Sequence, residues 1–267
     1  MASPDPKFFD LFAIDLQHVV SVEIRVAFHQ LVPVKLNQSN LDKLRQHEQE
    51  NPRAAKGLYI LHHKDKPCYV GKAERSLAKR LQEHLIKLGA RLNIAVKDVS
   101  FRCLYLDENW SALAHEASLI EQMGSPWNNN GFGNNDPGRK RDSTELGKTH
   151  FDRLHPINPD IALGLSPGNY TVHDALSAVK KDLPYLLRYE TKIDDQSLTT
   201  ADHQKTKLIV TSGDTASTLL GKAVDALGPS WQVTFLFGYV IFYQKEENFG
   251  SASCQKWKRG GQAWKTP

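Results

Sequence analysis

The sequence predicts an α+β fold in which a small antiparallel β-sheet is flanked by helices, with additions before and after this core. Short β-prone segments occur at 57–61, 68–71 and 99–106, and the last of them alternates its side chains in the manner of a strand. Helical patterns occupy about 75–88 and 110–123. The resulting order of strand, strand, helix, strand, helix favours a sheet with helices packed on it.

The flanking regions are expected to contribute further elements. Residues 19–36 are rich in β-branched and apolar side chains and are predicted to be extended, and a polar helix is expected at 39–49. A loop dense in Gly, Asn and Pro spans 128–142. Beyond it we expect a helix from Thr171 to about Tyr189 with a break at Pro184, a helix at 215–227 and β-structure at 231–243. The expected domains are 1–56, 57–142 and 143–267.

The composition is that of an ordinary globular protein, with 267 residues, 40% hydrophobic and 24% charged. No stretch approaches 18 uninterrupted apolar residues, and the first residues lack the pattern of a secretory signal. Cys68, Cys103 and Cys254 lie far apart, which argues against a disulfide scaffold or a structural zinc site. These features predict a cytoplasmic protein.

Basic residues are concentrated in two places, although the net charge is only +4. The segment 72–102 has eight basic and three acidic residues. The last 17 residues have four basic residues, no acidic ones and two tryptophans: Lys256, Lys258, Arg259, Lys265, Trp257 and Trp264. Such local density attracts a phosphate backbone, but a solvated surface and a frayed tail are equally good accounts of the tail.

Side chains on the two core helices suggest a site. Arg80, His84, Lys87 and Arg91 are expected beside the apolar stripe of the first helix, as a basic column or as an ordinary solvated face. Glu116 falls on the apolar stripe of the second helix. A buried carboxylate requires a cationic partner, and arginine and a divalent metal ion are both suitable.

Two tyrosines in the first two strands complete this set. Tyr59 and Tyr69 each lie two residues from a glycine, Gly57 and Gly71, and such glycines permit close approach of a backbone or a phosphate. A tyrosine in a strand is more often a packing residue.

Taken together, these residues resemble the GIY-YIG nuclease superfamily, whose two motifs appear as Gly57-Leu58-Tyr59 and Tyr69-Val70-Gly71. The family's helix arginine, metal-binding glutamate and later asparagine are matched by Arg80, Glu116 and Asn128. The type II restriction endonuclease branch adds a histidine one turn after the arginine, matched by His84, and a loop that reads GFGNNDPG at 131–138. Leu58 replaces the isoleucine of the first motif.

The resemblance implies metal-dependent hydrolysis of DNA phosphodiester bonds. Glu116 would bind one Mg²⁺, for which Mn²⁺ could substitute, and Arg80 would contact the scissile phosphate. Tyr59 is the candidate general base, His84 could receive or relay its proton, and Tyr69 would bind the phosphate or position the water. Tyr69 and His84 are also alternatives for the base, and Asn128 would hold the loop and backbone groups around the site. The expected DNA-binding residues are Lys72, Lys87, Arg91, Asn134, Arg139, Lys140 and Arg141.

The resemblance also implies particular partners. The substrate would be double-stranded DNA with a palindromic, GC-rich site, cut by a homodimer or homotetramer. Residues 1–56 would contact DNA or dimerise, and 143–267 would recognise DNA or oligomerise.

Three rival interpretations stay open. A structure-selective or toxin nuclease with the same core is one, and a non-catalytic DNA-binding module is another. The third is a PD-(D/E)xK nuclease, suggested by Asp160 with Glu190 and Lys192 and disfavoured by the absence of a predicted strand around Glu190.

Overall fold

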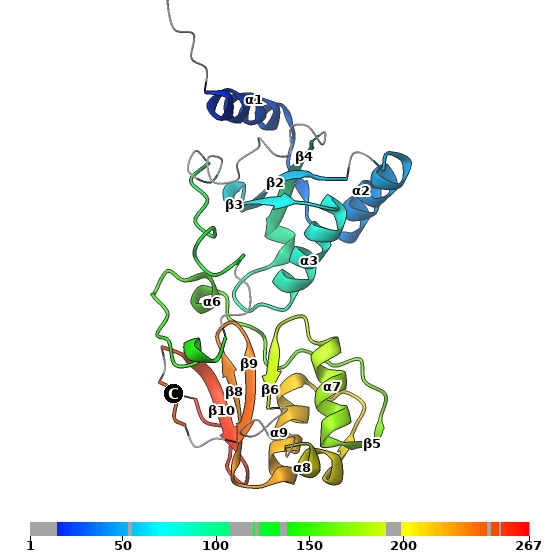
Figure 1. The fold of residues 1–267 in the computed structure, drawn as a ribbon, viewed down its shortest axis with the longest axis vertical. Coiled ribbons are helices and arrows are strands. Elements are labelled where there is room, and N and C mark those ends of the chain that lie inside the picture. The colour runs from blue at the N-terminus through cyan, green and yellow to red at the C-terminus, as the bar shows by residue number, and fades with distance from the viewer. Residues whose placement is uncertain are drawn as a thin grey trace, which may run out of the picture. The chain divides into compact units, whose positions relative to one another are not determined.

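A computed structural model describes residues 15–52, 55–106, 120, 123–133, 138–190, 199–244, 247–250 and 252–266. The chain divides into two compact units. The first contains the residues up to Arg80 together with Val99–Ser125, and the second contains Leu81–Asp98 together with Pro126–Pro267. Each unit has its own sheet (Figure 1).

The first unit is built on the predicted antiparallel sheet. It contains β1 (Val34–Lys35), β2 (Gly57–His63), β3 (Lys66–Ala73) and β4 (Val99–Tyr105), in the order β1-β4-β2-β3. A tight turn joins β2 to β3, and its two residues, Lys64 and Asp65, both have positive φ. Such a turn matches the twist of a hairpin. The α+β class is therefore confirmed, and β2 lies between β3 and β4.

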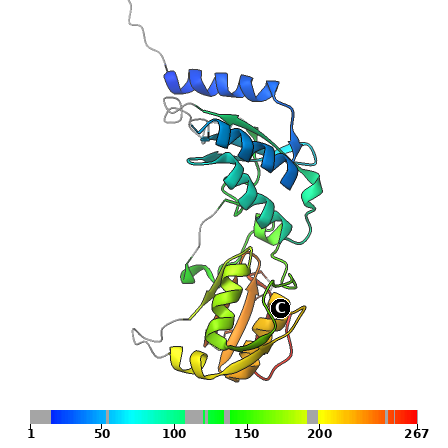
Figure 2. The ribbon, with the colours of Figure 1, turned by 90° about the vertical axis from the view of Figure 1, so that its right-hand side faces the viewer.

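Helices cover both faces of this sheet. Helix α1 (Leu16–Gln30) packs on the face formed by Leu58, Ile60 and Val70. Helix α2 (Gln38–Glu50) lies on the opposite side (Figure 2), and the first turn of α3 (Leu77–Gly89) also belongs to this unit. Because side chains alternate along a strand, the odd-numbered positions of β2, Tyr59 among them, face away from α1.

The prediction of an extended segment at 19–36 is wrong for most of its length. The buried residues of α1 are Val20, Ile24 and Phe28, with Ser21, and their spacing of four is helical. Packing of this stripe on the sheet overrides the β propensity of the valines and isoleucines. Asp15 caps the helix by accepting a hydrogen bond from the His18 amide at 3.0 Å. Only β1 is extended.

A carboxylate from α2 fixes the start of α3. Glu48 accepts hydrogen bonds from the Ser76 hydroxyl at 2.6 Å and from the Ala78 amide at 2.9 Å. The first amides of a helix lack partners within the helix and favour negative charge. The helix that carries Arg80 is thereby anchored to the sheet's own unit. The second expected core helix, 110–123, lies outside the described residues except for Ile120 and Met123, which pack near α1.

The second unit contains a mixed four-stranded sheet in the order β10-β8-β9-β6. Its strands are β6 (Leu187–Tyr189), β8 (Trp231–Leu236), β9 (Val240–Gln244) and β10 (Cys254–Arg259), and only β6 with β9 is parallel. Helices α7 (Val172–Asp182), α8 (Thr199–Lys205) and α9 (Ala216–Leu227) lie beside it (Figure 1). The remaining elements are α6 (Phe151–Leu154), a two-stranded antiparallel sheet of β5 (Gly168–Thr171) and β7 (Lys207–Val210), and the 3-10 helices η1 (Val96–Asp98) and η2 (Arg139–Arg141).

Two predictions for this unit need correction. The helix expected up to Tyr189 ends at Asp182, and after Pro184 the chain forms β6. The basic tail is not frayed, because β10 pairs with β8 and Trp257 forms a bridge with Lys265. The predicted helix at 215–227 and β-structure at 231–243 are confirmed.

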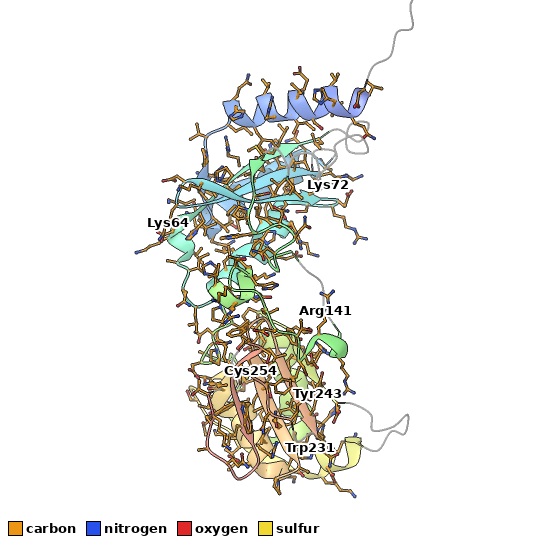
Figure 3. The ribbon with its side chains drawn as sticks, turned by 90° about the vertical axis from the view of Figure 1, so that its left-hand side faces the viewer. Lys64, Lys72, Arg141, Trp231, Tyr243 and Cys254 are labelled. Atoms are coloured by element: carbon orange, nitrogen blue, oxygen red, sulfur yellow. The ribbon has the colours of Figure 1, made fainter. Side chains whose placement is uncertain are left out.

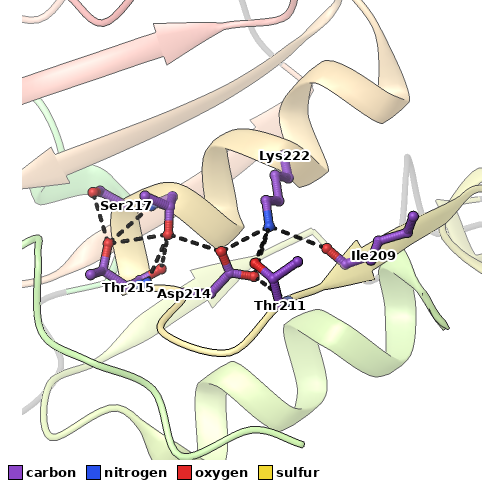
Figure 4. Close-up of polar contacts among 7 residues, drawn as sticks. Ile209, Thr211, Asp214, Thr215, Ser217 and Lys222 are labelled. Atoms are coloured by element: carbon purple, nitrogen blue, oxygen red, sulfur yellow. Dashed lines mark hydrogen bonds and ion pairs between the residues drawn. The ribbon is translucent and has the colours of Figure 1, made fainter. Parts of the chain in front are cut away.

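Helix α9 begins at a dense polar network (Figure 4). Lys222 contacts both carboxylate oxygens of Asp214 at 2.8 Å, and the Thr211 amide donates to the same carboxylate at 2.8 Å. Burial raises the pKa of Asp214, but the hydrogen bonds from Lys222 and Thr211 outweigh it and hold the pKa below its ordinary value. Thr215 caps the helix with Thr218 in a capping box.

Among the described residues, no helix has both the length and the apolar character that a membrane crossing requires.

Candidate active site

The two motif tyrosines lie on adjacent strands of the first sheet. Tyr59 on β2 is directly opposite Gly71 on β3, and its ring centroid is 6.1 Å from that of Tyr69. A side chain at position 71 would overlap the Tyr59 hydroxyl, so glycine is required there by close approach. The two motifs therefore pack against each other, because the absence of a side chain at Gly71 leaves room for the Tyr59 hydroxyl.

Arg80 lies next to this hydroxyl. It is on the first turn of α3, is half-buried, and its Nε donates to the Tyr59 hydroxyl at 3.4 Å. The guanidinium therefore places a positive charge beside the Tyr59 hydroxyl. Tyr59 is fully buried and Tyr69 is 6% exposed.

The glycine-rich loop is attached to α3 by an aromatic cluster within the second unit. Phe132 is fully buried, and its ring stacks on His84 with centroids 4.9 Å apart. Trp127 and Phe151 pack on Phe132 at 5.0 and 4.8 Å. Lys87 donates to the Phe132 carbonyl and lies over its ring. His84, predicted to act in catalysis, therefore contacts the loop through Phe132, and so does Lys87, predicted to bind DNA.

Gly131 is required at the preceding position of the loop. Its φ is +99°, and a side chain there would overlap the His150 imidazole. Asn128 is half-buried in the turn that leads into the loop, and Asn130 donates to the Thr149 carbonyl at 2.8 Å. Asn134 lies outside the described residues.

Arg91 differs from its expected place on the basic face of the helix. Helix α3 ends at Gly89, and Arg91 is buried with its Nη1 2.7 Å from the Asp152 carboxylate and 3.1 Å from the His155 carbonyl. Burial lowers the pKa of Arg91, and Asp152 opposes this effect. The Arg91 guanidinium thus forms a buried ion pair with Asp152 and does not lie on an exposed basic face.

Two further predicted site residues are Lys72 and Glu116. Lys72 on β3 is half-buried and its Nζ is 3.0 Å from the Glu74 carboxylate. Glu116, the expected metal ligand, lies outside the described residues. In the part of the chain that is described, no three His, Cys, Asp or Glu side chains are grouped as a metal site.

The basic triplet of the loop forms the 3-10 helix η2. Arg139 is exposed, and its Nη2 is 2.9 Å from the Glu190 carboxylate. Arg141 is exposed as well, and the side chain of Lys140 is not among those described. Glu190, a candidate in the PD-(D/E)xK interpretation, is thus paired with Arg139, while Asp160 accepts from Ser217 and Lys256.

Sequence reasoning missed the residues that carry the loop, above all Phe132, His150 and Asp152. One signal was available, because Phe132 is a large apolar residue between two glycines in an otherwise polar loop. Such a residue is usually an anchor in a core.

Comparison with known protein families gives a match in about the first two thirds of the chain. Residues 59–182 match the family described as the Eco29kI GIY-YIG domain. The matched range starts at Tyr59 and includes Tyr69, Arg80, the glycine-rich loop and α7. A comparison with curated proteins gave no match.

Proposed function

The chain carries a GIY-YIG nuclease domain of the Eco29kI family over residues 59–182, and from this premise we propose that it is a type II restriction endonuclease. It would hydrolyse phosphodiester bonds of double-stranded DNA at a specific sequence, with Mg²⁺. The observation that carries the proposal is the contact of Arg80 with the hydroxyl of Tyr59 against Gly71. This arrangement brings a candidate base and a phosphate-binding cation together at one point.

In the proposed reaction Tyr59 accepts the proton of the attacking water. Arg80 binds the scissile phosphate, and its charge favours both the ionised tyrosine and the more negative transition state. Tyr69, whose ring lies near that of Tyr59, would position the water or the phosphate. His84 and Tyr69 are the alternative bases, and Asn128 would hold the turn that precedes the loop.

A divalent metal ion is assigned to Glu116 from the sequence. A single hard carboxylate suits Mg²⁺, which commonly binds one or two carboxylates and keeps several waters, and Mn²⁺ accepts the same oxygen ligands. When bound, the ion would polarise a phosphate oxygen and stabilise the leaving 3′ oxygen. Binding of Mn²⁺ to the protein in the absence of DNA, followed by its paramagnetic resonance signal, should be lost in Glu116→Ala.

We propose fewer DNA-contacting residues than the sequence predicts. Lys72, Asn134 and Lys140 remain candidates for phosphate contact, whereas Arg91 and Lys87 already have partners in the interior. A palindromic, GC-rich site would suit arginine readers, and two chains would be needed to cut both strands.

The first experiment is incubation of the purified chain with Mg²⁺ and a large phage DNA, read on a gel. Discrete fragments support a restriction enzyme, and sequencing their ends gives the site. A smear would overturn the proposal in favour of a toxin or structure-selective nuclease. Retarded but intact DNA would indicate a binding module.

Tyr59→Phe tests the assigned base. It removes one hydroxyl and should lower the cleavage rate by about 100-fold or more, because a general base contributes 10²–10⁴. Affinity for the uncut site, measured with EDTA present, should be unchanged. Tyr170→Phe is the matched control, because Tyr170 on β5 carries a hydroxyl that donates to the Ser166 carbonyl. Equal cleavage by the two variants would exclude Tyr59 as the base.

A further inference from the structure

The basic triplet of η2 is followed at once by a buried carboxylate. Asp142 is 4% exposed, and its Oδ1 accepts from the Tyr239 hydroxyl at 2.9 Å and lies 3.1 Å from Nη1 of Arg188. The Arg188 guanidinium also lies over the Tyr239 ring, 4.5 Å from its centroid. We call Asp142, Arg188 and Tyr239 the Asp142 clamp. It joins the end of η2 to β6 and to the turn before β9.

The clamp is a stable arrangement because each member satisfies another. Burial raises the pKa of Tyr239, and the hydrogen bond to Asp142 acts in the same direction, so the hydroxyl stays protonated and donates. Arg188 provides the positive charge that a buried carboxylate requires. A buried pair of this kind with two further contacts fixes the backbone at Asp142 in one position.

The other end of η2 is tied to the same sheet by a different contact. Arg139 reaches Glu190 at 2.9 Å and lies over the Tyr243 ring at 4.5 Å. Glu190 accepts in turn from the Gln244 amide of β9 at 2.9 Å. Figure 3 labels Arg141 at this short helix and Tyr243 on the neighbouring strand. Both ends of η2 are therefore held by β6 and β9.

The two arginines of η2 consequently differ in what they can do. Arg139 is engaged on the sheet, whereas Arg141 is exposed and lines a cavity of about 560 Å³ in the second unit, together with Lys87 and His150. An arginine on a fixed backbone loses less freedom when it binds than one on a flexible loop. A guanidinium held in this way can form two hydrogen bonds to the edge of a guanine.

We infer that Arg141 is a base-reading residue of this nuclease and that the Asp142 clamp positions it. The inference rests on the proposed function, since it assigns the specificity of the same reaction. Arg139 is a structural link in this assignment, and Asp142, Arg188 and Tyr239 act through Arg141 without touching DNA.

The test separates reading of sequence from general DNA affinity. The 267-residue chain is incubated in EDTA with a pool of random DNA duplexes, and the bound DNA is sequenced. The ratio of affinities for the selected site and for unrelated DNA is then measured for Arg141→Ala and Tyr239→Phe. Lys148→Ala and Tyr170→Phe are matched controls, since Lys148 is an exposed base of the same unit and Tyr170 loses a hydroxyl outside the clamp.

Arg141→Ala should lower this ratio by about 10- to 100-fold, the discrimination of one bidentate base contact. Its affinity for unrelated DNA should fall no further than that of Lys148→Ala. Tyr239→Phe keeps the ring under Arg188 and loses one hydrogen bond, so a loss of about 3- to 10-fold in the ratio is expected. Both variants should melt close to the wild type, and a lowered ratio at an unchanged melting temperature would exclude a purely structural role.

An unchanged ratio in Arg141→Ala would overturn the assignment of the reader. A ratio in Tyr239→Phe equal to that in Tyr170→Phe would overturn the role of the clamp. Failure of the proposed function looks different, because the wild-type chain itself would then select no sequence from the pool.

Discussion

At the scale of single residues, the contact between Tyr59 and Gly71 decides whether the candidate site can form. Ala at position 71 would occupy the place of the Tyr59 hydroxyl, and both β2 and β3 are buried at this point. Gly71→Ala should therefore displace Tyr59 and cost about 1–3 kcal/mol of folding stability, as insertion of a methyl into a packed site does. Cleavage should fall by at least tenfold, because the hydroxyl moves away from Arg80.

The control for this substitution is Gly89→Ala at the end of α3. No atom lies within 4 Å of a side chain built there, so the change should leave stability and cleavage close to the wild type. The free energies of unfolding from urea titrations and the initial rates of cleavage test both variants. Wild-type behaviour of Gly71→Ala would contradict the packing of Tyr59 on Gly71.

These residues also show how far the sequence leads. Tyr59, Tyr69 and Arg80 could be chosen because they match the motifs of the GIY-YIG superfamily, and the structure places Arg80 at the Tyr59 hydroxyl. The burial of Arg91 could not be predicted from the sequence. Its burial depends on Asp152, 61 residues further along, and a pairing over that distance is set by tertiary packing.

At the scale of elements, polar caps determine where several helices begin. Glu48 binds the start of α3, and Asp214 with Thr215 and Lys222 forms the start of α9. The sequence predicted α9 well because its caps are local, within eight residues. It failed for α1, where the buried stripe of Val20, Ile24 and Phe28 was read as β-prone composition.

The Asp214 network supports a prediction about acid stability. Lys222→Met removes the cation from a buried carboxylate and should destabilise the second unit by about 1–2 kcal/mol near pH 7, a value reduced by the partial exposure of Lys222. Because the pKa of Asp214 is lowered in the folded protein, the stabilisation is present above the ordinary carboxyl pKa and is lost as pH falls through the folded value. The difference between variant and wild type should therefore shrink below about pH 4.

Urea titrations between pH 3 and pH 7 measure this difference directly. Lys207→Met, at an exposed lysine of the neighbouring strand β7, is the matched control and should show no such pH dependence. A constant difference between Lys222→Met and the wild type over the whole range would show that the ion pair with Asp214 does not contribute.

At the scale of the whole molecule, the family match crosses the boundary between the two compact units. Residues 59–182 include the sheet with Tyr59 and also the loop, α6 and α7 of the second unit. Outside the matched range, β9 and the turn before it hold η2 through Tyr243 and Tyr239. The sequence predicted β-structure at 231–243 but gave no sign of this connection, because the partners in it lie about 100 residues apart.

The proposed function makes one prediction about the assembly. One site per chain cuts one strand, so a palindromic site should be cut on both strands only by two active chains. The Glu116→Ala variant should bind DNA but not cut it. When the wild-type chain is re-equilibrated with an excess of this variant, mixed dimers with one active site should form. A supercoiled plasmid with one recognition site should then accumulate as the nicked circle, whereas the wild type alone yields linear DNA. If the mixture instead forms linear DNA more slowly but no nicked circle accumulates, each chain cuts both strands by itself.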